Sequence, residues 1–191
     1  MNTATDTLRR EHEAILEMLA ACEEAARKIQ AGIYVPPEIL SGLLEFFQLF
    51  ADRCHHGKEE DCLFPLLEQK GMPRRAGPIA VMLYEHEQGR ALVRQMKSVS
   101  EAYTERQTEA ASLWVQSALG YVTLLRSHIE KENNVLFRMA ESILSESEQA
   151  ELSRKFDSVE AEKMGEGTHE RLHLRMHELL SQISTLDRVV A

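Results

Sequence analysis

Two ten-residue segments of the chain match each other without a gap, 73 residues apart. Residues 55–64 and 128–137 share histidine, lysine, glutamate, leucine and phenylalanine at corresponding positions. A shorter match, the tripeptide Glu-His-Glu, occurs at residues 11–13 and again 74 residues later at 85–87. Each half of the chain therefore supplies an early histidine and a later His-x-x-x-Glu motif. This order predicts two copies of one helical hairpin.

The spacing of apolar residues is helical, and no segment alternates with the two-residue period of a strand over a useful length. The 9 glycines and 5 prolines are too few for the many turns of an all-β protein. We therefore predict an all-α, up-down-up-down four-helix bundle over residues 1–141, because short connections make neighbouring helices antiparallel. The helices are expected from Asp6 to Gly32, from Pro37 towards Gly71 with a kink or break at Pro65, from Pro78 to about Thr104, and from about Thr108 to Ala140.

The helical pattern becomes shorter after residue 141. Ser145 followed by Glu148 is typical of a capping box, and it predicts a helix that ends near Gly165. Thr168 is expected to cap a last helix that runs through Val189. We interpret residues 142–191 as a helical appendage packed on the bundle within the same domain, because some fifty residues make a weak core alone.

Composition and charge exclude several classes of function. The net charge of -9 leaves no broad basic surface for phosphates, which argues against nucleic acid as a partner. No run approaches the ~18 apolar residues of a membrane span, and the polar N-terminus does not resemble a signal peptide. The cysteines are odd in number and lack a CxxC pair, so neither disulfides nor a thiolate zinc site is expected. These features predict a cytoplasmic protein, with its oligomeric state left open.

Helical spacing indicates where the repeated polar residues point. Positions four apart share a face at roughly 100° per residue, so the histidine and glutamate of each His-x-x-x-Glu motif project together. The same arithmetic places these histidines among apolar residues, together with the one earlier histidine of each half, His12 or His86. The side chains predicted to face the interior are His12, His55, Glu59, His86, His128 and Glu132.

Together these six side chains predict a metal site. A single buried histidine is commonly explained by a hydrogen bond to a neighbour, but six buried polar groups would each cost about 1–3 kcal/mol if left unpaired. Imidazole and carboxylate without thiolate suit iron, manganese or zinc, and two glutamates can bridge two ions. We expect His12 and His55 on one metal and His86 and His128 on the other, with both glutamates between them.

Several residues near this set keep two interpretations. Spacing places His56 and Glu60 outside the apolar stripe. The alternative is that His56, which flanks the site, is an extra metal ligand or hydrogen-bonds one of the ligands. Tyr121 is expected to be a core aromatic, or else to hydrogen-bond a metal-bound species. His169 begins a row of three late histidines that is typical of an exposed helix face, with contact to the centre as the alternative. Arg90 requires a glutamate or an anion as its partner.

The chain resembles the hemerythrin-like proteins of the HHE cation-binding type over about residues 8–140. The resemblance lies in His12, in His55-x-x-x-Glu59 followed by Leu63-Phe64-Pro65, in Glu85-His86-Glu87 followed by Gly89-Arg90, and in His128-x-x-x-Glu132. It implies a four-helix bundle that holds two iron ions in a non-haem, oxo- or hydroxo-bridged centre, with manganese or zinc as alternatives. The implied partner is a small ligand: dioxygen, peroxide or nitric oxide.

The sequence also departs from known members of that family. Oxygen-carrying hemerythrins have His-x-x-x-His on the third helix and His-x-x-x-x-Asp on the last, whereas here Met82 or Arg90 stands four residues from His86. A missing nitrogen ligand argues against reversible oxygen carriage. The N-terminal cysteine domain of iron–sulfur repair relatives and the F-box of an iron-sensing relative are not expected here. The alternative function is a module that senses iron or oxygen, or that holds iron. A ferritin-like oxidase ranks last, because it needs Glu-x-x-His on two inner helices and this chain has that motif only on a late helix.

Overall fold

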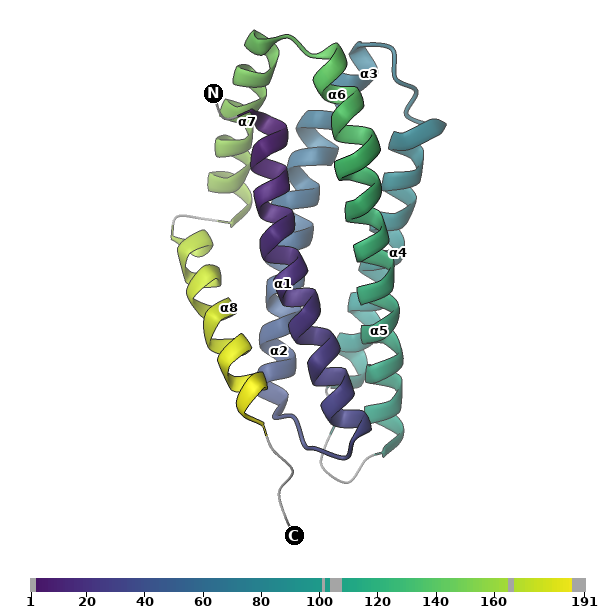
Figure 1. The fold of residues 1–191 in the computed structure, drawn as a ribbon, viewed down its shortest axis with the longest axis vertical. Coiled ribbons are helices and arrows are strands. Elements are labelled where there is room, and N and C mark those ends of the chain that lie inside the picture. The colour runs from purple at the N-terminus through teal and green to yellow at the C-terminus, as the bar shows by residue number, and fades with distance from the viewer. Residues whose placement is uncertain (1–2, 101, 104–107, 165–166, 187–191) are drawn as a thin grey trace.

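The computed structural model describes residues 3–100, 102–103, 108–164 and 167–186, and every regular element in these ranges is a helix. The long helices lie side by side, with two shorter helices along one side of them (Figure 1). The predicted all-α helical bundle is confirmed. Within the described ranges, no helix combines the length and the apolar character needed to cross a membrane.

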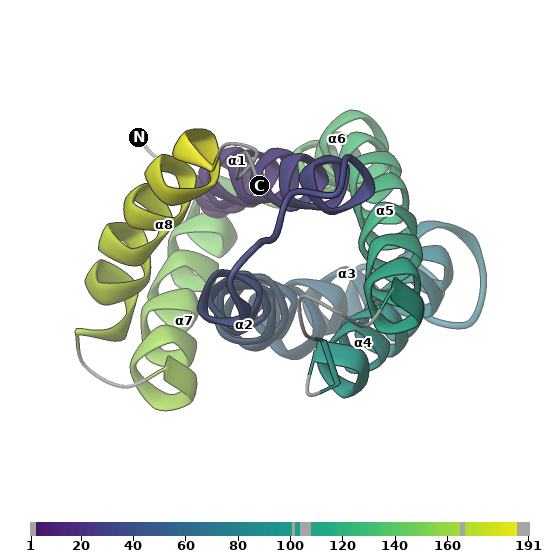
Figure 2. The ribbon, with the colours of Figure 1, turned by 90° about the horizontal axis from the view of Figure 1, so that it is seen from below.

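The bundle consists of continuous helical stretches, some of which change from α-helical to π-helical (η) turns and back. They are α1 (Ala4–Gln30); α2 (Pro37–Phe46), which continues through η1 (Phe47–His56), η2 (Glu59–Leu63) and α3 (Phe64–Gln69); α4 (Gly77–Ser100); and α5 (Thr108–Lys131), which continues through η3 (Glu132–Leu136) and α6 (Phe137–Ile143). Contacts of α4 with α5, α5 with α1, α1 with α2 and α2 with α4 close the bundle on four sides (Figure 2).

The ends of the bundle helices lie close to the positions predicted from the sequence, with small differences. The first helix begins at Ala4 rather than at Asp6, because Thr3 is the N-cap and Asp6 completes a capping box by accepting from the Thr3 backbone N–H. Gly32 and Gly71 follow their helices with φ of 77° and 95°, a backbone region that favours glycine. The third helix ends at Ser100, whereas the predicted end at Thr104 lies outside the described residues. The fourth helix extends to Ile143 rather than Ala140.

The π-helical turns explain why the second helix does not end at Pro65. Proline lacks an N–H, and its ring collides with the carbonyl four residues earlier in a regular α-helix. The turn before Pro65 is wider: the Phe64 N–H donates to the carbonyl of Glu59, five residues back. The chain therefore remains helical to Gln69. In the second half the Phe137 N–H donates to the carbonyl of Glu132 in the same way, so both halves of the repeat have a π-helical turn at this place.

Two further helices pack on one side of the bundle. The helix α7 (Glu146–Met164) begins with the predicted capping box, in which the Ser145 N–H donates to Glu148 at 2.9 Å. The helix α8 (Thr168–Thr185) has Gly167 rather than Thr168 as its N-cap and ends at Thr185, well before Val189. Both helices contact α1, and α8 also contacts α2, with Leu179 close to Gly42. The residues Leu172, Met176, Leu179 and Ile183 of α8 are buried in the apolar core.

The apolar core is divided into two clusters. One cluster lies towards the α1–α2 turn and includes Phe47 and Trp114, whereas the other lies towards the α3 end and includes Phe64 and Phe137. Along each long helical stretch, the buried histidines and glutamates lie between the residues of the two clusters. The fold therefore places a polar layer inside the bundle, with apolar packing above and below it.

Candidate metal centre

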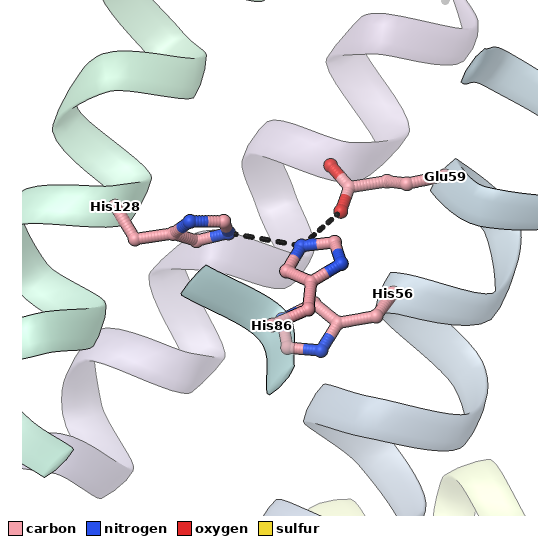
Figure 3. A group of neighbouring side chains, drawn as sticks. All are labelled: His56, Glu59, His86 and His128. Atoms are coloured by element: carbon pink, nitrogen blue, oxygen red, sulfur yellow. Dashed lines mark hydrogen bonds and ion pairs between the residues drawn. The ribbon is translucent and has the colours of Figure 1, made fainter. Parts of the chain in front are cut away.

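The structure brings the six predicted side chains into that polar layer. The four histidines are each 1% exposed and the two glutamates are 0% exposed, although they come from four different helical stretches. Their ligand atoms fall into two groups, and within each group the atoms lie within 4.8 Å of one another. The first group contains His12, His55, Glu59 and Glu132. The second contains His56, Glu59, His86 and His128 (Figure 3).

Both glutamates lie between the two groups. One carboxylate oxygen of Glu59 is 3.7 Å from Nε2 of His55, and the other is 3.4 Å from Nε2 of His86. Glu132 repeats this arrangement, with one oxygen 3.1 Å from Nε2 of His12 and the other 3.2 Å from Nε2 of His128. Each carboxylate thus has one oxygen for each group, as a bridge between two ions requires.

Most of the inward-facing atoms lack hydrogen-bond partners. Nε2 of His12, Nε2 of His55 and both oxygens of Glu59 and Glu132 are buried and make no hydrogen bond to the protein. Nε2 of His86 and Nε2 of His128 are 3.1 Å apart (Figure 3). So many unpaired acceptors in a dry interior are strongly unfavourable, and bound cations remove that cost. The residues therefore fit a metal centre.

The outer nitrogen of each histidine is held by an oxygen. The pairs are His12 Nδ1 with Asn133 at 2.9 Å, His55 Nδ1 with Glu11 at 2.9 Å, His56 Nδ1 with Asp52 at 3.4 Å, His86 Nδ1 with Glu60 at 2.6 Å, and His128 Nδ1 with Glu85 at 3.0 Å. A proton on Nδ1 leaves the Nε2 lone pair free to bind a metal. Partners of this kind fix the tautomer and the orientation of metal-binding histidines.

Basic residues hold these outer carboxylates in turn. Lys58 pairs with Glu11, and at the corresponding place in the second half Lys131 pairs with Glu85. Arg90 donates to Asp52, Glu60 and Glu87, each at 2.7–2.8 Å. The partner that the sequence required for Arg90 is therefore a set of carboxylates.

Burial governs the charge of the centre without its metal. It lowers the pKa of three imidazoles, to about 4 for His55 and about 3 for His56 and His86. Burial also lowers the pKa of His128, but Glu132 and Glu85 outweigh it and raise that pKa to about 9. Burial, followed by the charge of Glu132, raises the pKa of Glu59. Cations between the two carboxylates would stabilise both in the ionised form.

The expectation that His56 lies outside the apolar stripe is wrong. His56 is only 4% exposed and stacks on His86, with ring centroids 3.8 Å apart, whereas Glu60 is partly exposed. The reason is the π-helical turn, which holds one more residue than an α-helical turn and lets His55 and His56 both face inward. Pro65 follows a later π-helical turn, Glu59–Leu63, and does not signal this one. The outer partners Glu11 and Glu85 could have been found from their places in the repeat.

Of the remaining open residues, Tyr121 does not join either group. Tyr121 is a buried core aromatic that packs against Phe47, with ring centroids 4.8 Å apart. The side chains of His169 and His173 lie outside the described part of the structure, and His177 is exposed.

Comparison with known proteins agrees with this geometry. The family described as "Hemerythrin HHE cation binding domain" matches residues 3–140, which include every member of the two groups. No solved structure has significant similarity to the chain.

Two curated relatives extend the comparison. The uncharacterized protein Rv1995 of Mycobacterium tuberculosis is 26% identical over 164 residues, which cover 86% of this chain and 64% of that protein. The iron-sulfur cluster repair protein YtfE of Salmonella newport is 34% identical over 137 residues, which cover 69% of this chain and 61% of YtfE. The chain thus spans less than two thirds of each relative. Its family match extends over most of its own length, and the chain belongs to the hemerythrin HHE cation-binding domain family.

Proposed function

We propose that the centre binds two iron ions and reacts with a small molecule: dioxygen, peroxide or nitric oxide. The observation that carries this proposal is the pair of inward-facing groups, which share Glu59, are both approached by Glu132, and include six buried atoms without a hydrogen-bond partner. Nitrogen and oxygen donors without thiolate suit iron, manganese or zinc. The name of the relative YtfE, an iron-sulfur cluster repair protein, favours iron among these.

The two proposed positions differ in their nitrogen donors. His12 and His55 would hold the first ion, and His56, His86 and His128 the second, with Glu59 and Glu132 between them. His56 of the second helical stretch would thus supply the nitrogen ligand that is missing beside His86 on the third helix. Arg90 pairs with three carboxylates, and its guanidinium has no lone pair with which to bind a metal.

Bound iron supplies electrons and Lewis acidity, and the protein supplies order and exclusion of water. The Nδ1 hydrogen bonds hold each imidazole with its Nε2 towards the centre. The apolar clusters on either side restrict water. Asp52 is partly exposed and contacts His56, which gives the second position a polar connection to the surface.

A cavity of about 110 Å³ lies beside His56 and provides a route for the small molecule. This volume is well above the ~10–15 Å³ that admits one water. Four of its polar wall residues, Asp52, His56, Arg90 and Arg94, correspond at the repeat offsets to the apolar Leu125, Ile129, Leu16 and Ala20, whereas the fifth, Gln48, corresponds to Tyr121, which lines the same cavity. Most of the polar wall is therefore not a requirement of the hairpin fold, since the other half places apolar residues at four of these five positions. We assign it to ligand access.

The test is to mix the reduced, iron-loaded protein with dioxygen in a stopped-flow spectrometer. We expect a rapid absorbance change that is not reversed when oxygen is removed under vacuum. Release of intact dioxygen under vacuum would identify a carrier and contradict the proposed reaction. No change with dioxygen, peroxide or nitric oxide would also contradict it, and would favour the iron-holding alternative.

A further inference from the structure

A chain of charged side chains connects α7 to the first proposed metal position. Nδ1 of His55 is 2.9 Å from a carboxylate oxygen of Glu11, and the other Glu11 oxygen accepts from the Lys58 ammonium. Lys58 also donates to Glu160 of α7 at 3.0 Å. Because Lys58 is only 1% exposed, its charge depends on these two carboxylates rather than on water.

Comparison of the two halves of the repeat shows that the contact of this lysine with α7 occurs only in the first half. Lys131 corresponds to Lys58 and pairs with Glu85, which corresponds to Glu11. The side chain of Lys131 is 37% exposed and makes no second ion pair in the described structure. The basic pair is therefore common to both halves, whereas burial of the lysine under a carboxylate of α7 occurs only in the first.

The cluster around Lys58 is not a second metal site. Glu11, Cys54 and Glu160 are close enough together to hold an ion. The Lys58 ammonium, however, already pairs with both carboxylates. Burial raises the pKa of the Cys54 thiol to about 12, so no thiolate is available there.

We propose that Glu160 is a positioning residue for His55, and that docking of α7 and metal binding at the first position stabilise each other. Glu160 fixes Lys58, Lys58 fixes Glu11, and Glu11 orients the imidazole. The inference rests on the proposed function, since it requires a metal at that position. It assigns a role to a helix beyond residue 140, where the family match ends. Coupling of this kind is reciprocal, so metal binding must also favour the docked helix.

A second contact of α7 lies on the same segment. Lys163 pairs with Asp61, and its side chain covers Gly57, where a Cβ would lie 3.1 Å from the Lys163 Nζ. The helix α7 thus contacts both η1 and η2, which carry His55, His56 and Glu59. A change in how α7 is docked is therefore transmitted directly to residues of the centre.

The experiment compares the full-length variants Glu160→Gln and Glu162→Gln with the wild type, all loaded with iron. Both variants remove one charge from α7, but Glu162 is exposed and contributes no ion pair to this connection. We measure iron release to a chelator, and backbone hydrogen exchange of residues 146–164 with and without iron. For Glu160→Gln we expect one of the two ions to be released up to about 10-fold faster, the lower end of the range typical of losing an outer partner of a metal ligand, because Glu160 acts on His55 through Lys58 and Glu11.

In the wild type and in Glu162→Gln, iron should increase the protection of α7 from exchange, and this increase should be smaller in Glu160→Gln. A purely structural role for Glu160 would lower protection equally with and without iron and leave release unchanged, which would overturn the inference. Equal acceleration for both ions would also overturn it. If the wild type binds no iron, the proposed function fails instead, so the two failures are distinguishable.

Discussion

Each histidine of the centre has its outer nitrogen, Nδ1, next to an oxygen of a neighbouring side chain. Spacing alone predicted which four histidines and two glutamates face inward, because helical periodicity determines the direction of a side chain. The outer partners were not predicted, since Asn133 and Glu60 act across helices on His12 and His86. Such contacts depend on how the helices pack, and a single sequence does not reveal packing. The position of Glu59 and Glu132 between histidines of both halves became measurable only in the folded chain.

Glu59 and its neighbour Glu60 should differ sharply when replaced. We expect Glu59→Ala to lower bound iron below one ion per chain, because it removes oxygens from both groups. Glu60→Ala removes the outer partner of His86 and one partner of Arg90 but no atom of either group, so both ions should bind, with affinity for one reduced about 10–100-fold. Elemental analysis after dialysis against chelator measures both effects. Equal losses in the two variants would contradict the assignment of the helix faces.

At the level of secondary-structure elements, the π-helical turns are the feature that sequence reasoning missed. A rotation of roughly 100° per residue was applied through residues 47–56, and this assumption turned His56 away from the interior, because that segment is π-helical. The break considered at Pro65 does not occur, because the chain accommodates this proline by widening the preceding turn. The helix starts at Pro37 and Glu146 were predictable because proline at the first helical position and the capping box are local signals.

The contact between α2 and α8 is close enough to require a glycine. A Cβ on Gly42 would lie 2.9 Å from a methyl carbon of the buried Leu179, whereas a Cβ on Gly120 would be 3.5 Å from Leu92, an ordinary contact. We expect Gly42→Ala to lower the free energy of unfolding by about 1–3 kcal/mol through overpacking. Gly120→Ala, the control, should leave it unchanged or raise it by up to ~1 kcal/mol because alanine favours helix. Urea unfolding checks both, and equal effects would contradict this packing.

At the level of the whole molecule, the sequence repeat organises the bundle but does not make its halves equivalent. The repeated motifs predicted two related hairpins and a shared polar layer, and the structure places the ligand atoms of both halves together. The asymmetry comes from residues outside the motifs: His56 corresponds to Ile129, and Arg90 to Leu16. Whether such differences gather around one cavity depends on the assembled fold, so the sequence alone could not indicate it.

If the cavity beside His56 is the route to the centre, a larger side chain in its wall should slow the reaction. Val93 lines this cavity, and its counterpart Leu19 lies in the apolar core of the other half. We expect Val93→Phe to reduce the rate of the absorbance change with nitric oxide about tenfold or more, within the range that variants of one site span. Leu19→Phe should retain the wild-type rate. Unchanged kinetics in folded, iron-loaded Val93→Phe would contradict access from this side.

The central claim is that both halves of the repeat contribute to one centre with two ions. Crystals of the protein purified from iron-supplemented cells, measured on both sides of the iron absorption edge, test it most directly. We expect two anomalous peaks about 3.5–4 Å apart, as in other two-metal sites. One peak should lie between His12 and His55 and the other between His86 and His128, with Glu59 and Glu132 in contact with both. A single ion bound by residues of only one hairpin would contradict the account.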